Sequence, residues 1–226
     1  MSFLYVNAEK KLYYITLPKT ASTFTSNILK TYYDFKPTTH ELHEMYNSDK
    51  LLMVYYSIRN GHTKWVNPIT YAGYTGFTIV RNPYERFISG YLNYGINQPF
   101  NEEVLNTPKK CILWQEKIKQ TNYTAYTHIF CTLTHFVRGL NIVPIHFEGL
   151  DTNLREFLTS HGFETTPHEN TPMNTTKNKD IPFYMYYDQF TLDFVNKTFE
   201  EDFINYGYPM FQTLKGVCDH FGLVNL

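Results

Sequence analysis

The sequence predicts an α/β fold, in which a central, mostly parallel sheet is flanked by helices, as a single domain of residues 1–226. Continuous apolar runs of strand length, at 12–17, 51–58 and 76–80, are typical of buried parallel strands. Helical patterns alternate with these runs. The 226 residues are 42% hydrophobic and 18% charged, which is ample for a folded core.

The first predicted strand, Leu12–Leu17, leads into a loop of small and polar residues. Ser22 or Thr23 is the expected cap of a helix that continues to about Tyr33. The first N–H groups of a helix lack internal partners and carry partial positive charge, so such a loop attracts anions. Lys19 adds a full charge, and the hydroxyls of Thr20, Ser22 and Thr23 add donors. We therefore predict a loop that cradles phosphate or sulfate.

This loop differs from the phosphate loop of nucleotide kinases. That motif places glycines before a late Lys followed by Ser or Thr. Here Lys19 comes early, and the stretch from Leu17 to Thr25 contains no Gly. A kinase therefore remains the weaker alternative among enzymes.

The middle of the chain contains two more strand-to-helix transitions. The run 51–58 is followed directly by a polar stretch that contains His62. The run 76–80 is followed by Arg81 and by a strong helix start, with Asn82 as the cap, Pro83 in the first turn and Glu85 completing a capping box. The expected inward-facing stripe of this helix comprises Tyr84, Phe87 or Ile88, and Tyr91.

The later elements are predicted from periodicity and turn residues. Helices are expected at 112–119 and 123–137, followed by a strand at 142–147 whose Pro144 indicates an edge or a strand end. Asp151 is the expected cap of a helix that ends at Gly162. A polar loop, 164–182, precedes a last helix that starts at Asp188 or Thr191 and continues to about Tyr206.

Composition narrows the class of protein. A net charge of −1 predicts neither a nucleic-acid nor a membrane partner. The three cysteines, Cys111, Cys131 and Cys218, are odd in number and widely spaced, so we expect no disulfide framework, no metal site and a reducing compartment. Neither a signal peptide nor a membrane-spanning run is apparent, and we expect a cytoplasmic protein.

Three candidate site residues follow strands and are therefore expected at one edge of the sheet. Lys19, His62 and Arg81 each come directly after a predicted strand, at the edge where open α/β sheets bind ligands. Ser89 lies two turns along the helix that follows Arg81. Taken alone, Arg81 could form a structural ion pair and Ser89 could be an exposed helix residue. Together with the first loop they predict a ligand with two separated anionic ends.

Two motifs resemble those of sulfotransferases that use 3′-phosphoadenosine 5′-phosphosulfate (PAPS). Residues 17–23, Leu-Pro-Lys-Thr-Ala-Ser-Thr, are similar to the family's 5′-phosphosulfate loop, with Ala21 at a position that is often Gly. Residues 77–91, with Arg81 and Ser89, resemble its 3′-phosphate motif. Pieces at 145–151, 168–170, 186–188 and 201–208 are similar to the carbohydrate, Golgi-type branch, including its uronyl 2-O-sulfotransferases.

The resemblance implies a P-loop-like three-layer fold and a metal-independent transfer of the sulfuryl group from PAPS. It assigns the 5′-phosphosulfate to Lys19 and to the segment Thr20, Ala21, Ser22, Thr23 and Phe24. It assigns the 3′-phosphate to Arg81 and Ser89. Because sulfuryl transfer resembles phosphoryl transfer, positioning and electrostatic stabilisation are its main requirements.

An acceptor hydroxyl needs a general base, because its pKa lies far above neutrality. His62 is the first candidate, since Gly61-His62 resembles a Gly-His pair of the uronyl 2-O-sulfotransferase group. The alternatives are His40 and His43, which have Glu41 and Glu44 beside them. Five other histidines have no motif that assigns them a role, and we expect them to be structural or exposed to solvent: His128, His135, His146, His161 and His220.

The acceptor implied by the resemblance is a carbohydrate. A small-molecule alcohol or phenol is the alternative acceptor, and a catalytically silent nucleotide-binding module is the alternative outside the enzymes. Eukaryotic members of this branch are usually luminal and membrane-anchored. No anchor is apparent here. We therefore expect a cytoplasmic enzyme of bacterial or viral origin, or a shortened form of a longer chain.

Overall fold

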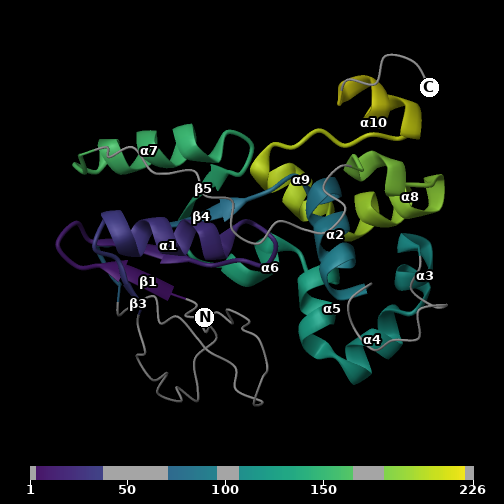
Figure 1. Ribbon diagram of the computed structural model, residues 1–226, viewed down its shortest axis with the longest axis horizontal. Coiled ribbons are helices and arrows are strands. Elements are labelled where there is room, and N and C mark those ends of the chain that lie inside the picture. The colour runs from purple at the N-terminus through teal and green to yellow at the C-terminus, as the bar shows by residue number, and fades with distance from the viewer. Residues whose placement is uncertain (1–3, 38–70, 96–106, 165–180, 222–226) are drawn as a thin grey trace. The chain divides into compact units, whose positions relative to one another are not determined.

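The computed structural model describes residues 4–37, 71–95, 107–164 and 181–221 (Figure 1). The chain forms two compact units. The first comprises residues 1–81 and 133–174, and the second comprises residues 82–132 and 175–226. The single domain expected over residues 1–226 stays a prediction. The strand expected at 51–58 lies outside the described residues.

The first unit contains a sheet that confirms the predicted α/β class. Its strand order within the described residues is β3 (Lys36–Pro37), β1 (Leu4–Asn7), β2 (Leu12–Ile15), β4 (Thr75–Val80) and β5 (Ile142–His146). Strand β4 pairs in parallel with both β2 and β5, whereas β1 pairs antiparallel with β2 and β3. The position of β5 at the end of this order agrees with the edge strand expected from Pro144.

Strand β2 is not the first strand, contrary to the prediction, because β1 precedes it in a hairpin. The turn lacks Gly and Pro, and the Asn7 side chain organises it instead. Asn7 Oδ1 accepts a hydrogen bond of 2.9 Å from the Lys10 N–H, and Lys11 has a positive φ of 51°. This bond from the Asn7 side chain to the backbone three residues on takes the place of the glycine that is typical of hairpin turns.

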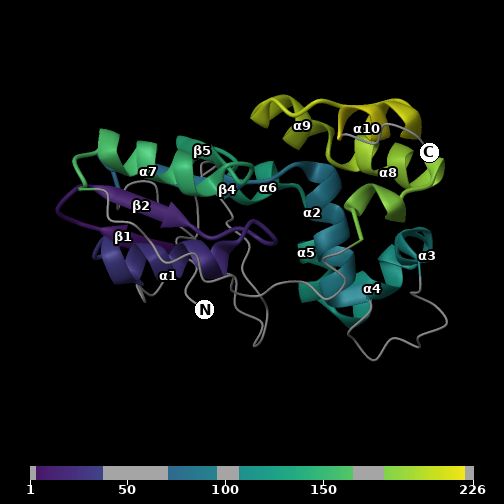
Figure 2. The same cartoon turned by 45° about the horizontal axis from the view of Figure 1, so that its top comes forward.

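Two helices, α1 (Ser22–Tyr32) and α7 (Leu150–Ser160), pack with the strands of this unit around one core, and Figure 2 shows them running along the strands. Tyr14 and Phe77 are partners in the β2–β4 register, so their side chains share a face of the sheet. The Phe157 ring of α7 lies 4.6 Å from the Phe77 ring, measured between centroids. Ile28 and Leu29 of α1 belong to the same buried cluster.

The second unit is helical in its described residues (Figure 1). Its elements are α2 (Pro83–Gly90), the π-helical turn η1 (Tyr91–Gly95), α3 (Pro108–Leu113), α4 (Gln115–Thr121), α5 (Tyr123–Phe130), the 3₁₀ turn η2 (Phe183–Tyr186), α8 (Gln189–Thr198), α9 (Glu200–Tyr206) and α10 (Leu214–His220). The expected inward stripe of α2 is confirmed, because Tyr84, Phe87, Ile88 and Tyr91 are all buried in this unit's core.

Some predicted helices of the later chain are divided into shorter ones. The pattern at 123–137 contains α5 and a separate helix, α6 (Leu133–Val137), which belongs to the first unit. The last predicted helix consists of α8 and α9, and α10 was not predicted. A period of 3.6 residues identifies helical segments, but it does not show where one helix stops and the next begins.

Asn82 caps α2 as predicted, and Asp188, one of the two starts predicted for the last helix, caps α8. Asn82 Oδ1 accepts from the Tyr84 N–H at 3.0 Å, and Asp188 Oδ1 accepts from the Thr191 N–H at 2.7 Å. The prediction for Asp151 was wrong: Gly149, in the left-handed region at φ 79°, is the N-cap of α7, and Asp151 lies in its first turn. The acidic side chain still lies at the positive end of the helix dipole.

A buried charge pair ties α2 to α9 within the second unit. Arg86 and Asp202 are both fully buried, and Arg86 Nη2 lies 3.9 Å from Asp202 Oδ2. The same Nη2 donates a hydrogen bond of 2.6 Å to the carbonyl oxygen of Cys131. The Arg86 guanidinium also lies 4.8 Å from the centroid of the Phe199 ring. Removing either partner would leave an uncompensated buried charge, so this pair locks α2 into its unit.

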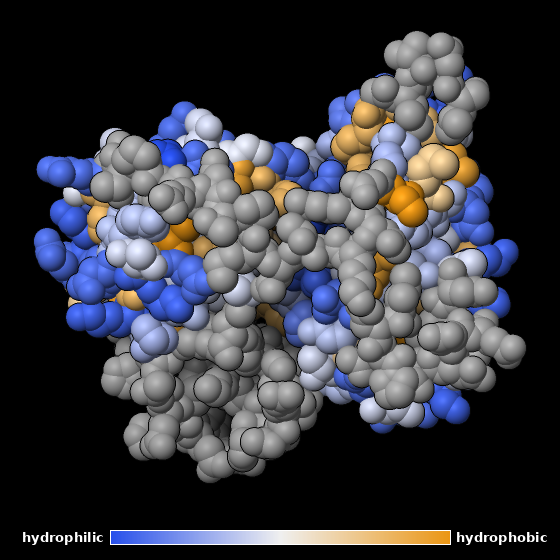
Figure 3. Space-filling model, in the orientation of Figure 1, coloured by the Kyte–Doolittle hydropathy of each residue, from blue (hydrophilic) through white to orange (hydrophobic). Residues whose placement is uncertain are grey.

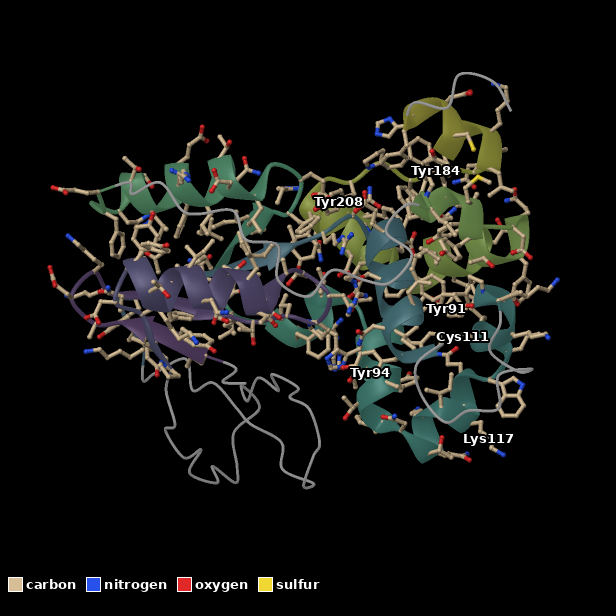
Figure 4. All side chains as sticks on the ribbon, in the orientation of Figure 1. Tyr91, Tyr94, Cys111, Lys117, Tyr184 and Tyr208 are labelled. Atoms are coloured by element: carbon tan, nitrogen blue, oxygen red, sulfur yellow. The ribbon has the colours of Figure 1, made fainter. Side chains whose placement is uncertain are left out.

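The interior of the second unit also contains polar groups that are held neutral. Burial raises the pKa of both Tyr91 and Cys111 to about 12 (Figure 4). Neither group ionises near neutral pH, so both act as packing residues.

The surface seen in Figure 3 is mostly hydrophilic over the described residues, with scattered apolar spots.

Candidate active site

The loop between β2 and α1 contains two residues in the left-handed region. Lys19 has φ 64° and Ala21 has φ 59°, whereas φ of Thr20 between them is not positive. An alternation of this kind turns successive N–H groups toward one point and forms a concave anion site, or nest. The Thr20 hydroxyl donates a hydrogen bond of 3.1 Å to the Leu17 carbonyl oxygen. This bond links two residues of the loop to each other.

Ala21 is the N-cap of α1, which corrects the prediction of Ser22 or Thr23. No side chain caps this helix, and both hydroxyl residues lie in its first turn. The left-handed backbone at Ala21 sets the start of the helix. A prediction of the N-cap from side-chain type does not detect this backbone conformation. Phe24, on the same turn, packs against the core of the first unit. The N-terminus of α1 therefore faces the loop without a competing side-chain acceptor.

The Lys19 side chain is half-buried at this loop. Burial, followed by the nearby positive charge of Arg81, lowers the pKa of its ammonium group to about 8. Both effects disfavour the charged form, and both would be offset by an anion in the loop.

Arg81 follows β4 directly and lies beside Lys19. Arg81 Nη1 donates to the Lys19 carbonyl oxygen at 3.4 Å. Because β2 and β4 are parallel neighbours, their carboxyl ends meet at one edge of the sheet, as predicted. The Arg81 guanidinium also lies 4.4 Å from the centroid of the Phe147 ring. In the sequence, Phe147 belongs to the family-like piece 145–151 and ends the strand predicted at 142–147, and neither feature indicated a contact with Arg81.

Ser89 belongs to α2 in the second unit and is buried, with 9% of its surface exposed. The alternative of an exposed helix residue is therefore wrong. Gly90 follows it and brings α2 close to α5: a Cβ atom there would lie 2.9 Å from the His128 carbonyl oxygen. A side chain at this position would force the two helices apart, so Gly90 fixes the position of Ser89 within the unit.

The three base candidates, His62, His40 and His43, lie outside the described residues. Within the described residues, no three His, Cys, Asp or Glu side chains are grouped so that they could hold a metal ion. The helices in that part of the chain also include none with the length and apolarity needed to cross a membrane.

The family model described as "Sulfotransferase family" matches residues 3–209 of the chain. This match covers most of the sequence, including the first loop, Arg81 and Ser89. The chain therefore belongs to the sulfotransferase family and is a sulfotransferase, PAPS-dependent by family. No curated protein and no solved structure was found to match it.

Proposed function

We propose that this sulfotransferase moves the sulfuryl group of PAPS to a hydroxyl group of a carbohydrate by in-line displacement. The observation that carries the proposal is the meeting of two cations at one sheet edge, where Arg81 Nη1 lies 3.4 Å from the Lys19 carbonyl oxygen. The family match supports the reaction class. The residue roles and the carbohydrate acceptor are the proposed part.

The residues of the first unit fit the 5′ end of this donor. The left-handed backbone at Lys19 and Ala21 favours a concave set of N–H groups, and α1 begins there without a side-chain cap. We assign the 5′-phosphosulfate to Lys19 and to the backbone of Thr20, Ala21, Ser22, Thr23 and Phe24. Oriented N–H groups and one ammonium suit a ligand with several anionic oxygens.

We assign the 3′-phosphate to Arg81 and Ser89, as the resemblance implies. The planar guanidinium of Arg81 can bind phosphate oxygens through two parallel hydrogen bonds. A hydroxyl such as that of Ser89 can donate one more.

When bound, PAPS supplies an activated sulfuryl group. The Lys19 ammonium stabilises the charge that develops on the leaving phosphate and on the sulfuryl oxygens. The loop backbone holds the donor in line with the acceptor. His62 accepts the proton from the acceptor hydroxyl, and His40 or His43 is the alternative base.

The sulfate-transfer experiment uses labelled PAPS with a panel of glycans and small alcohols and phenols. Lys19→Ala is expected to lower the rate by about 10²- to 10³-fold, because it removes a group that stabilises transition-state charge. Lys30→Ala, an exposed lysine on α1, is the matched control and is expected to retain the wild-type rate. His62→Ala is expected to cost about 10²- to 10⁴-fold, and His40→Ala and His43→Ala much less.

Each outcome tests a separate part of the proposal. Labelling of phenols or small alcohols in place of glycans would overturn the carbohydrate acceptor. A larger loss for His40→Ala or His43→Ala than for His62→Ala would reassign the base. Binding of nucleotide without labelling of any acceptor would overturn transfer itself and support a silent nucleotide-binding module.

A further inference from the structure

The Arg81 guanidinium packs on an aromatic ring that is itself held in place. Its central carbon lies 4.4 Å from the centroid of the Phe147 ring. The Phe147 N–H donates to the Val80 carbonyl oxygen at 2.8 Å, which continues the β4–β5 ladder one residue beyond β5. Val80 directly precedes Arg81. The backbone bond therefore sets Phe147 beside Arg81 and makes their contact a consequence of strand register.

The turn that contains Phe147 is clamped by the Asn153 side chain of α7. Asn153 Nδ2 donates to the His146 carbonyl oxygen at 3.1 Å and to the Glu148 carbonyl oxygen at 2.9 Å. These two carbonyls flank Phe147. An amide nitrogen offers two N–H donors, so one Asn side chain can make both bonds. The clamp fixes the backbone on either side of the ring.

Two further backbone features complete this turn. The Leu150 N–H donates to the Phe147 carbonyl oxygen at 3.0 Å. Gly149 has φ +79°, a left-handed conformation that other L residues rarely adopt. These bonds restrain the backbone of the turn that contains Phe147.

A guanidinium that stacks on an aromatic ring can still donate hydrogen bonds from the N–H groups along its edge. The ring limits how far the plane of the guanidinium can tilt. The Lys19 carbonyl oxygen accepts a bond from Nη1 and restrains the group on a second side. The two restraints together orient Arg81 before a ligand arrives. An oriented fork loses less side-chain freedom when it binds phosphate.

We propose that Phe147, clamped by Asn153, is a positioning residue that holds Arg81 in the orientation that binds the 3′-phosphate of PAPS. This inference rests on the proposed function, because it takes the 3′-phosphate as the ligand of Arg81. It adds Phe147, in the turn after β5, and Asn153, on α7, to the determinants of donor specificity. Both residues act on donor binding through Arg81 and do not touch the donor themselves.

The test compares adenosine 3′,5′-bisphosphate with adenosine 5′-phosphate, which lacks the 3′-phosphate, by calorimetric titration of the full chain. Phe147→Leu removes the ring and keeps an apolar side chain, and it is expected to weaken bisphosphate binding about three- to tenfold. Monophosphate binding is expected to stay within twofold. Phe147→Tyr retains the ring and is expected to restore the wild-type preference. Asn153→Ala is expected to shift the preference in the same direction as Phe147→Leu.

Phe157→Leu is the matched control, because Phe157 packs against the same core but contacts Phe77. It is expected to leave the ratio of the two affinities unchanged. If Phe147 had only a structural role, Phe147→Leu would change both affinities by the same factor. The ratio of the two affinities would then stay unchanged, as expected for the control Phe157→Leu. In an Arg81→Lys background, Phe147→Leu is expected to add less than a twofold loss, because the two residues act as one unit.

The possible failures are distinguishable. If the wild-type chain binds both nucleotides equally, the 3′-phosphate assignment of Arg81 is wrong, and the inference falls with the proposed function. If the wild type prefers the bisphosphate and Arg81→Lys loses that preference, but Phe147→Leu retains it, the positioning role alone is overturned.

Discussion

At the scale of single residues, Lys19 combines a strained backbone with a perturbed side chain. Its φ is 64°, and burial beside Arg81 lowers the pKa of its ammonium to about 8. A residue in the left-handed region costs free energy, and such strain concentrates at functional sites. The left-handed backbone at Lys19 therefore fits the proposed anion-binding role of the loop.

The pKa of Lys19 predicts a pH dependence of nucleotide binding. Below about pH 8 the ammonium is charged in the free protein, and above it the charge is lost. The affinity for adenosine 3′,5′-bisphosphate should therefore fall as pH rises from 8 to 10, by at most about tenfold per pH unit. Calorimetric titration across this range measures it, and Lys19→Arg, which stays charged, should flatten the profile. A wild-type profile that is already flat would contradict this assignment.

Ala21 predicts a change in stability. A left-handed conformation costs Ala about 1–2 kcal/mol, whereas Gly adopts it freely but loses about 0.5–1 kcal/mol of extra entropy on folding. Ala21→Gly should therefore raise the free energy of unfolding by about 0.5–1 kcal/mol, measured by urea denaturation. The same substitution at buried Ala125, inside α5, should be destabilising. A lower urea midpoint for Ala21→Gly would show that the left-handed backbone is not strained.

At the scale of elements, the helices begin in two different ways. Asn82 caps α2 through its side chain and is buried, with Pro83 in the first turn. Ala21 begins α1 through its backbone conformation alone. The first arrangement satisfies the helix N-terminus internally. The second leaves that end of the dipole directed at the loop, which is the arrangement that an anion site requires.

The cap of α2 predicts a loss of stability. Asn82→Ala removes the acceptor for the Tyr84 N–H and should cost about 1–2 kcal/mol, because the cap is buried and the donor is left without this partner. Asn82→Asp keeps an acceptor and should cost less. Thr107→Ala removes an exposed cap of α3 and is the control, with an expected loss near 0.5 kcal/mol. Thermal unfolding of the three variants measures the order, and equal losses for the two alanine variants would contradict it.

At the scale of the whole molecule, the described residues contain two separate buried clusters, one in each compact unit. Leu29 belongs to the cluster of the first unit and Leu192 to that of the second, and both are fully buried. The chain leaves the first unit after Arg81, returns to it at Leu133 and leaves it again after residue 174. Each unit is therefore assembled from segments that are distant in sequence.

The separate cores predict additive effects of substitution. Leu29→Ala and Leu192→Ala should each cost about 2–5 kcal/mol, through lost burial and the cavity left behind. Because the two residues share no buried cluster, the double variant should show the sum within about 0.5 kcal/mol. Guanidinium chloride unfolding of the single and double variants measures this. A coupling energy above 1 kcal/mol would show that the two cores depend on each other.

Much of the fold and part of the site could be predicted from local sequence patterns. The continuous apolar runs identified β2 and β4, and the order Asn82-Pro83 identified the start of α2. Lys19 and Arg81 were expected at one sheet edge because each follows a strand. These inferences succeed because periodicity, cap chemistry and chain direction are properties of neighbouring residues.

The remaining features depend on tertiary structure. The contact of Arg81 with Phe147 and the buried pair of Arg86 with Asp202 each join segments that are far apart in the chain. Such contacts depend on strand register and helix packing, which no local pattern specifies. The sequence by itself indicated the reaction class, which the family match supports, and placed Lys19 and Arg81 at one edge of the sheet. Only the tertiary structure decided how those cations are oriented, because orientation comes from the side chains packed against them.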